Sequence, residues 1–155
     1  MRQLFAGVVL AAMACGGGEA ADSEGAVPES AAPAAAAAAA TEAGEVHEVL
    51  MQEIDGQMVY TPSTLTIKAG DTVRWINRSG GPHNVAFYAD QVSESAADVL
   101  NAAMVNRLGD LNGGLVVEPE AAYTIDFTGA PVGDYGYYCM PHEVVGMVAS
   151  LTVVE

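Results

Sequence analysis

Positive charge is scarce in this sequence. Only five lysine and arginine side chains stand against 20 aspartates and glutamates, so the formal net charge of the 155 residues is -15 at pH 7. So acidic a surface repels nucleic acid and anionic lipid headgroups, which argues against both as partners. Two explanations of the charge stay open: it selects a basic partner protein, or it only keeps the protein soluble.

Cysteine is also scarce, and no apolar run is long. The two cysteines, Cys15 and Cys139, lie in segments of very different composition, so a disulfide between them is not expected. The apolar stretch at residues 4–14 is too short for a permanent membrane-spanning helix, which needs about 20 apolar residues. Each cysteine therefore needs its own explanation.

The first 15 residues have the pattern of a secretory signal. Arg2 supplies a positive charge, residues 4–14 are apolar, and Cys15 follows a small-x-small triplet. A cysteine at that place resembles a bacterial lipoprotein signal, in which it becomes the acylated first residue; the alternative is ordinary cleavage that leaves a free thiol. We expect residues 1–14 to be a lipoprotein-type signal peptide. The protein would then be exported to the periplasmic or cell-surface face of a membrane, held there only by a lipid on Cys15.

Residues 15–44 differ in composition from the rest of the chain. They are rich in Ala, Pro, Gly and Glu, contain no aromatic residue, and include an unbroken alanine run at 34–40. Such a segment cannot bury enough apolar surface to offset its ordering entropy. We expect a lipidated Cys15 followed by a disordered linker that acts as a tether. One folded domain is expected at residues 45–155, which is long enough for a single hydrophobic core.

The folded domain has the pattern of an all-β protein with one helix. Short alternating or extended runs are separated by turns rich in glycine and proline. The runs predicted as strands are 46–54, 64–68, 72–77, 123–127, 135–139 and 147–154. Within 93–108, Ala97, Leu100, Met104 and Leu108 recur at helical spacing. We therefore expect an antiparallel β-sandwich with a short helix inserted between strands.

One ten-residue segment combines three metal-binding side chains. The only cysteine of the predicted domain, Cys139, is followed by His142 and Met147 at the junction of two predicted strands. A second imidazole, His83, follows a different strand. Two histidines and one cysteine, with a distant methionine on the axis, form the arrangement of electron-transfer copper sites. The four residues therefore predict one blue-copper site.

Several segments resemble the small cupredoxins, most closely the plastocyanin group. Residues 138–142 and 146–148 are similar to the family's ligand loop, 82–85 to its other ligand segment, and 62–73 to its early strands. The resemblance spans residues 46–154 and implies an eight-stranded Greek-key β-sandwich with the copper at one end. It also implies a single-electron carrier, cycling between Cu(I) and Cu(II), and no enzymatic activity.

The resemblance assigns roles to residues around the predicted site. The residue matching Asn84 braces the cysteine loop through hydrogen bonds, which metal ligands generally require, and Pro82 lies near the site beside the ligand His83. The histidine matching His142 is the exposed edge through which electrons leave, ringed by an apolar patch, and Tyr138 marks a possible second electron route. The implied partners are redox proteins, such as a c-type cytochrome or a membrane redox complex, and the protein is expected to act as a monomer.

Two other functions would use some of the same residues. A catalytic copper centre needs further histidine ligands, but the third of three histidines, His47, is predicted to lie on the surface. A protein for copper trafficking or storage in the periplasm would use methionine-rich or exposed ligands; of seven methionines, only Met140 and Met147 fall near the site. Trafficking or storage is the alternative to electron transfer.

Residues 90–114 form a longer and more helical segment than the family resemblance implies, so a surface that contacts partners is expected to differ.

Overall fold

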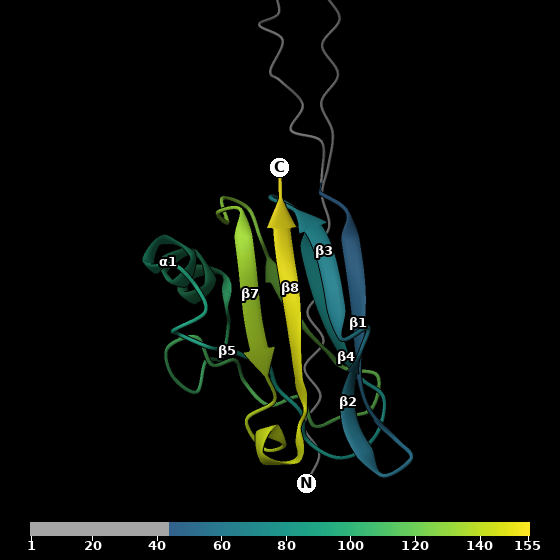
Figure 1. The fold of residues 1–155 in the computed structure, drawn as a ribbon. Coiled ribbons are helices and arrows are strands. Elements are labelled where there is room, and N and C mark those ends of the chain that lie inside the picture. Colours follow the sequence, from purple (N-terminus) through teal and green to yellow (C-terminus); the bar gives the residue numbers. More distant parts are fainter. Residues whose placement is uncertain (1–43) are drawn as a thin grey trace, which may run out of the picture. The chain divides into compact units, whose positions relative to one another are not determined.

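Residues 44–155, the part of the chain that the structure describes, form a β-sandwich in the computed structural model (Figure 1). The elements in chain order are β1 (Val46–Ile54), β2 (Gln57–Thr61), β3 (Thr64–Lys68), β4 (Thr72–Asn77), β5 (Ala86–Phe87), α1 (Glu94–Ala103), β6 (Ala122–Asp126), β7 (Gly133–Tyr138), the short 3-10 helix η1 (Glu143–Val145) and β8 (Val148–Val154). One sheet has the order β2-β1-β4-β6 and the other β3-β8-β7-β5. The expected eight-stranded sandwich with one inserted helix is confirmed.

The direction of the strands differs from the purely antiparallel arrangement that we expected. β1 runs parallel to β4, with Val46 opposite Thr72, and β3 runs parallel to β8. The other paired strands are antiparallel. Alternation of apolar and polar residues shows which face of a strand is buried, but it carries no information about the direction of the neighbouring strand. Both sheets are therefore mixed.

The hydrophobic core lies between the two sheets. Val73 and Trp75, predicted to share one face of β4, are both completely buried, and Tyr137 and Leu151 face them from the second sheet's strands. Each such side chain contributes roughly 1.5–3 kcal/mol through burial. Towards the end of β4 the alternation stops, and Asn77 is buried as well. This end of the strand leads to the predicted metal-binding residues.

The inserted helix α1 is shorter than its sequence pattern suggests. Ser93 caps its first turn by accepting a hydrogen bond of 3.1 Å from the backbone N–H of Ala96, and Leu100 is buried against the core. The helix ends at Ala103 because Met104 adopts an extended conformation (φ -74, ψ 128). Leu108, the last apolar residue at helical spacing, is 52% exposed and lies outside the helix. The prediction of a helix over 93–108 was therefore wrong at its C-terminal end.

The chain that follows the helix turns back along the edge of the sandwich. The backbone N–H of Phe87 donates to the carbonyl of Leu111, and the N–H of Gly113 donates to the carbonyl of Val85. Residues 111–113 thereby pair with the two-residue strand β5 through an isolated bridge between Ala86 and Asn112. This segment ends beside the loops that hold the predicted site.

His47, expected at the surface, lies at the opposite end of the sandwich and is partly buried. Its side chain is 18% exposed, and its Nε2 lies 2.9 Å from the carboxylate of Asp71. The same carboxylate accepts hydrogen bonds of 2.8 Å from the backbone N–H groups of Glu45 and Lys68. Because β1 and the β3–β4 turn both contribute, Asp71 joins the first strand to the rest of the fold.

Several sequence predictions fall on residues 1–43. The signal peptide at 1–14, the acylated Cys15 and nearly all of the linker at 15–44 lie outside the described residues. Within the described part, no helix is both long enough and apolar enough to cross a membrane.

Candidate metal centre

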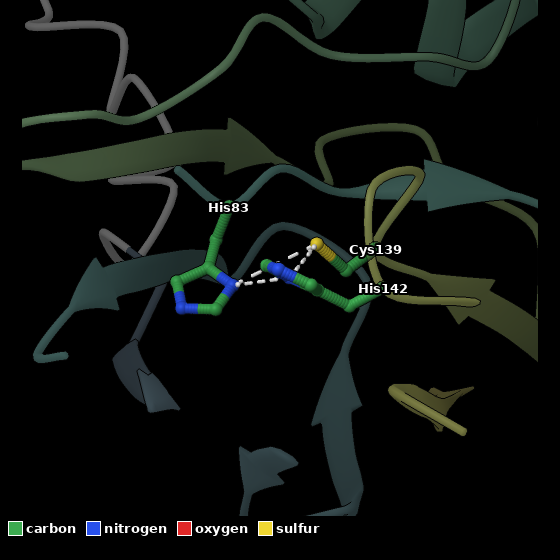
Figure 2. A group of neighbouring side chains, drawn as sticks. All are labelled: His83, Cys139 and His142. Carbon is green, nitrogen blue, oxygen red and sulfur yellow. Dashed lines mark hydrogen bonds between the residues drawn. The ribbon is translucent and has the colours of Figure 1, made fainter. Parts of the chain in front are cut away.

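Three donor atoms converge at one end of the sandwich (Figure 2). The Sγ of Cys139 lies 3.7 Å from the Nδ1 of His83 and 3.4 Å from the Nδ1 of His142, and the two Nδ1 atoms are 3.2 Å apart. Among residues 44–155, these are the only histidine, cysteine and carboxylate side chains that gather in a group able to hold a metal ion. Donors from two loops, 56 residues apart in the sequence, thus meet at one point.

The spacing of the three donors fits a bound metal ion. A point equally distant from all three atoms would lie about 2.0 Å from each, which is the length of a typical metal–imidazole bond, roughly 2.0–2.1 Å for zinc. Two imidazoles and one thiolate, with no carboxylate, suit copper better than hard cations, which prefer oxygen ligands. The geometry and the chemistry of the donors therefore both fit copper.

A backbone carbonyl determines which nitrogen of His83 faces the other donors. The Nε2 of His83 lies 2.7 Å from the carbonyl oxygen of Ser79. A carbonyl can only accept, so Nε2 carries the proton and Nδ1 keeps its lone pair for a metal. The ring is completely buried, and this burial lowers the pKa of His83. The imidazole is thus held neutral and in the tautomer that a ligand requires.

The loop after β7 closes on itself through backbone hydrogen bonds. The N–H of Cys139 donates to the carbonyl of Met147, and the N–H of Met147 donates to the carbonyl of His142. The N–H of His142 in turn donates to the carbonyl of Cys139. Cys139 and Met147 are both completely buried. The predicted cysteine, histidine and methionine ligands are therefore held by one compact loop.

Burial raises the pKa of the Cys139 thiol, and hydrogen bonds from the backbone of Asn84 and His142 oppose the rise. A metal binds the thiolate rather than the thiol. Metal binding at this site therefore releases a proton from Cys139, and the backbone hydrogen bonds help to stabilise the sulfur once it is charged.

His142 lies at the molecular surface, unlike the other donors. Its side chain is only partly buried, and η1 begins at the next residue. Apolar side chains on the same loop are exposed: Val144 by 92%, Val145 by 63% and Met140 by 44%. Exposed apolar side chains therefore lie beside the edge of the site that His142 occupies, together with the carboxylate of Glu143 on the same loop.

The structure brings Asn84 into direct contact with the ligand loop. Its Oδ1 accepts a hydrogen bond of 2.8 Å from the backbone N–H of Met140. Its backbone carbonyl accepts a bond of 2.6 Å from the hydroxyl of Tyr60, a residue that sequence reasoning missed. Pro82 lies exposed next to the buried His83. Asn84 therefore links both ligand segments to the core.

Tyr138 is half-buried and stacks on a second tyrosine. The rings of Tyr138 and Tyr88 have centroids 4.5 Å apart, and the Tyr88 hydroxyl donates to the carboxylate of Glu143 at 2.9 Å. Partial burial and this hydrogen bond raise the pKa of Tyr88 to about 12. Sequence reasoning missed Tyr88 and the Ser79 carbonyl, since neither occurs in a motif and any residue can supply a carbonyl.

The sandwich and its donor set define the class of the protein: it is a cupredoxin, a small β-sandwich with a copper site at one end. The family described as copper binding proteins, plastocyanin/azurin family, matches residues 47–154. The chain therefore belongs to the plastocyanin/azurin family of copper-binding proteins. The family, the fold and the copper cofactor implied by the sequence resemblance are confirmed.

Plastocyanins are among the similar proteins in both sequence and structure. The chain is 41% identical to the plastocyanin of Scenedesmus fuscus over 98 residues, which cover 63% of this chain and 89% of that protein. It is 38% identical to the plastocyanin of Synechococcus sp. (strain JA-2-3B'a(2-13)) over 111 residues, covering 72% and 75%. The oxidised plastocyanin of Dryopteris crassirhizoma superposes with a TM-score of 0.56 at 25% identity, covering 69% of this chain and 99% of that one.

Proposed function

We propose that the protein carries single electrons between redox proteins, with one copper ion held by His83, Cys139, His142 and Met147. When bound, copper supplies a one-electron couple between Cu(I) and Cu(II). The convergence of three donor atoms, two of them on completely buried side chains, is the observation that carries the proposal. Membership of the plastocyanin/azurin family supports it independently.

Hydrogen bonds between protein groups hold the donors in place. Ser79 anchors the ring of His83, the loop from Cys139 to Met147 is closed by backbone hydrogen bonds, and Asn84 ties this loop to the His83 segment. A site that is already shaped needs little rearrangement when its charge changes by one. Electron exchange through such a site is therefore fast, because little reorganisation has to precede it.

We propose that electrons leave at His142 and that a redox protein docks on the apolar surface around it. Three exposed apolar residues of the loop, Met140, Val144 and Val145, support this site of contact. The negative charge of the protein favours a basic partner, such as a c-type cytochrome, or a membrane redox complex with a basic face. The carrier would act as a monomer, and Tyr138 would provide a second route.

We further propose that the protein is exported and anchored by a lipid on Cys15 to the outer face of a membrane. The charged, apolar and small residues that precede Cys15 support this proposal. Residues 15–44 would then act as the tether between the anchor and the copper domain. The membrane would be contacted through the lipid alone.

The burial of the donors favours electron transfer over copper trafficking. A protein that hands its metal to a partner must expose its ligands, but His83, Cys139 and Met147 are completely buried. The described residues also contain no second group of metal ligands that could form a catalytic centre, since the remaining histidine, His47, is paired with Asp71. We therefore propose a carrier that keeps its copper and is not an enzyme.

The first test is spectroscopic. Addition of Cu(II) to the purified protein is expected to produce an intense blue thiolate-to-copper absorption band and a narrow copper hyperfine splitting in electron spin resonance. Cys139→Ser should abolish the blue band, because the thiolate is its source. His47→Gln, which removes the histidine outside the site, is the matched control and should keep the band. A colourless wild-type protein, or a square-planar copper spectrum, would contradict the proposal.

A further inference from the structure

Asn112 closes a ring of hydrogen bonds with two residues of the candidate metal centre. The Nδ2 of Asn84 donates to the Oδ1 of Asn112 at 2.7 Å, and the Nδ2 of Asn112 donates to the Sδ of Met140 at 3.4 Å. The backbone N–H of Met140 completes the ring by donating to the Oδ1 of Asn84. Met140 directly follows Cys139, so the ring includes the residue next to the thiolate.

The ring determines the orientation of both amide side chains. A backbone N–H can only donate, so the group of Asn84 that faces Met140 must be its oxygen. The Nδ2 of Asn84 then faces the carbonyl of Gly113 and the oxygen of Asn112. The amide nitrogen of Asn112 is left facing the Met140 thioether, which is a weak acceptor. Only this orientation of the two amides therefore gives every donor and acceptor in the ring a partner.

The segment that carries Asn112 is itself held in a strained conformation. Leu111 has a φ of 57°, in the left-handed region that a leucine rarely adopts and that costs about 1–2 kcal/mol. The side chain of Asn101, on α1, accepts a hydrogen bond of 2.7 Å from the Leu111 N–H and compensates for this cost. Strain of this kind persists only where the surrounding structure requires it.

The residue after Asn112 is a glycine for a steric reason. A Cβ on Gly113 would lie 2.7 Å from the ring of Tyr123, so the segment passes directly against this buried side chain. The hydroxyl of Tyr123 donates to the carbonyl of Val105, near the start of the same segment. Contacts on both sides of Asn112 thus hold the segment in place, so that the side-chain amide of Asn112 reaches Asn84.

We propose that Asn112 is a positioning residue for the copper-ligand loop, supplied by the segment that connects α1 to β6. It acts through Asn84 and Met140 and touches no donor atom itself. The inference rests on the proposed function only for its effect on the copper, since the ring consists of hydrogen bonds between protein groups. The unusual length of the segment at 90–114 thereby acquires a role at the metal centre.

Loss of Asn112 loosens the loop at Met140. The Asn84 amide keeps its bond to Gly113 but loses its second acceptor, so the bond from the Met140 N–H is less firmly held. Weaker positioning also weakens the hydrogen bonds from the backbone of Asn84 and His142 that stabilise the thiolate. Fewer hydrogen bonds to a ligating sulfur lower the reduction potential of a metal site. The variant is therefore expected to have a lower potential than the wild type.

The test uses the full chain in two states. Amide hydrogen exchange is measured at the Met140 N–H in the metal-free protein, and the reduction potential is measured with copper bound. Asn112→Ala removes both side-chain bonds, whereas Asn112→Asp keeps an oxygen that accepts from Asn84 and is the conservative rescue for the exchange measurement. Asp110→Asn changes an exposed side chain of the same segment and is the control.

In Asn112→Ala, exchange at the Met140 amide should accelerate about tenfold, as expected for the loss of one ordinary hydrogen bond, and the potential should fall. Asn112→Asp should restore most of the protection, and Asp110→Asn should match the wild type in both measurements. Exchange and potential unchanged in Asn112→Ala would overturn the inference. If the alanine variant does not fold, Asn112→Ser, whose side chain is too short to reach Asn84, provides the same comparison. Because the exchange is measured without metal, a wild type that fails to turn blue contradicts the proposed function and leaves the test of Asn112 intact.

Discussion

Met147 is the donor whose chemistry is easiest to change without disturbing the others. Its side chain is completely buried, and its backbone, not its sulfur, closes the ligand loop. We expect Met147→Leu to bind copper and to have a higher reduction potential, because a weak axial donor is lost while the loop keeps its hydrogen bonds. Redox titration of the blue band measures the effect.

A second buried methionine provides the control for this substitution. Met51 lies in the core on β1 and is as completely buried as Met147. Met51→Leu should cost less than about 1.5 kcal/mol in stability, as volume-conserving core changes do, and should leave the potential unchanged. A Met147→Leu protein with an unaltered potential would show that the thioether does not act on the copper.

At the residue scale, sequence reasoning named the three donors that the structure brings together and, through the family resemblance, the bracing residue Asn84, but it missed the Ser79 carbonyl and Asn112. Cys139, His142 and Met147 stand close together in one segment, so their spacing alone suggests a shared site. The carbonyl of Ser79 leaves no trace in the sequence, because every residue has one. Asn112 belongs to a different segment, and its role depends on a turn whose left-handed residue is a leucine rather than the usual glycine.

At the scale of secondary-structure elements, one carboxylate joins two segments, the start of β1 and the turn between β3 and β4. Asp71 accepts hydrogen bonds from the N–H groups of Lys68 and Glu45 and from the ring of His47. The Lys68 N–H has the largest effect, and together these bonds hold the pKa of Asp71 below its usual value. The stabilisation is fully present above the unfolded-state pKa of about 3.9 and is lost as the pH falls through the lower folded-state pKa.

We therefore expect Asp71→Asn to lower the free energy of unfolding at pH 7 by about 1.5–3 kcal/mol, the usual worth of hydrogen bonds to a charged group. The difference from the wild type should shrink as the pH is lowered below about 4, since the carboxylate is protonated first in the unfolded chain and, at lower pH, in the folded protein as well. Urea unfolding at pH 7 and at acidic pH measures both effects.

An exposed carboxylate on the helix serves as the control for Asp71. Asp98→Asn removes the same charge from α1, where the side chain is exposed. It should change stability by less than about 0.5 kcal/mol, as surface substitutions usually do. Equal losses in the two variants would mean that net charge, and not the three hydrogen bonds, determines the effect.

The predictability of each element follows its length and its burial pattern. β1, β3 and β4 have the bounds that the sequence suggested, because each alternates or extends between clear turns. β5 has only two residues, too few for any periodicity, and β2, which follows a turn at Asp55-Gly56, was not predicted from the sequence. The strand count was correct through the family resemblance, and the parallel pairing of β1 with β4 could not be inferred from alternation at all.

At the scale of the whole molecule, the predicted tether determines how far the copper domain can travel. We expect that deletion of residues 20–40 slows electron exchange between a donor and an acceptor held in the same vesicle membrane, because a shorter coil reaches fewer positions. The blue spectrum should not change. Turnover in proteoliposomes measures the rate.

Replacement of the same residues by a glycine–serine sequence of equal length is the control for the deletion. It preserves the reach of the coil and should preserve the rate. A deletion that leaves turnover unchanged would contradict the proposal that residues 15–44 act as a tether.

Both ends of the domain leave the sandwich on the side away from the metal centre (Figure 1). Gly44 and Val154 line the same cavity, and β8 runs from the ligand loop to this end over seven residues, roughly 23 Å. The domain could therefore be inserted as a cassette into a surface loop of a host protein, with its copper face turned outward. Fixed to an electrode by this end, it would exchange electrons with molecules in solution much faster than with the electrode, because the whole length of the sandwich separates the metal from the attached surface.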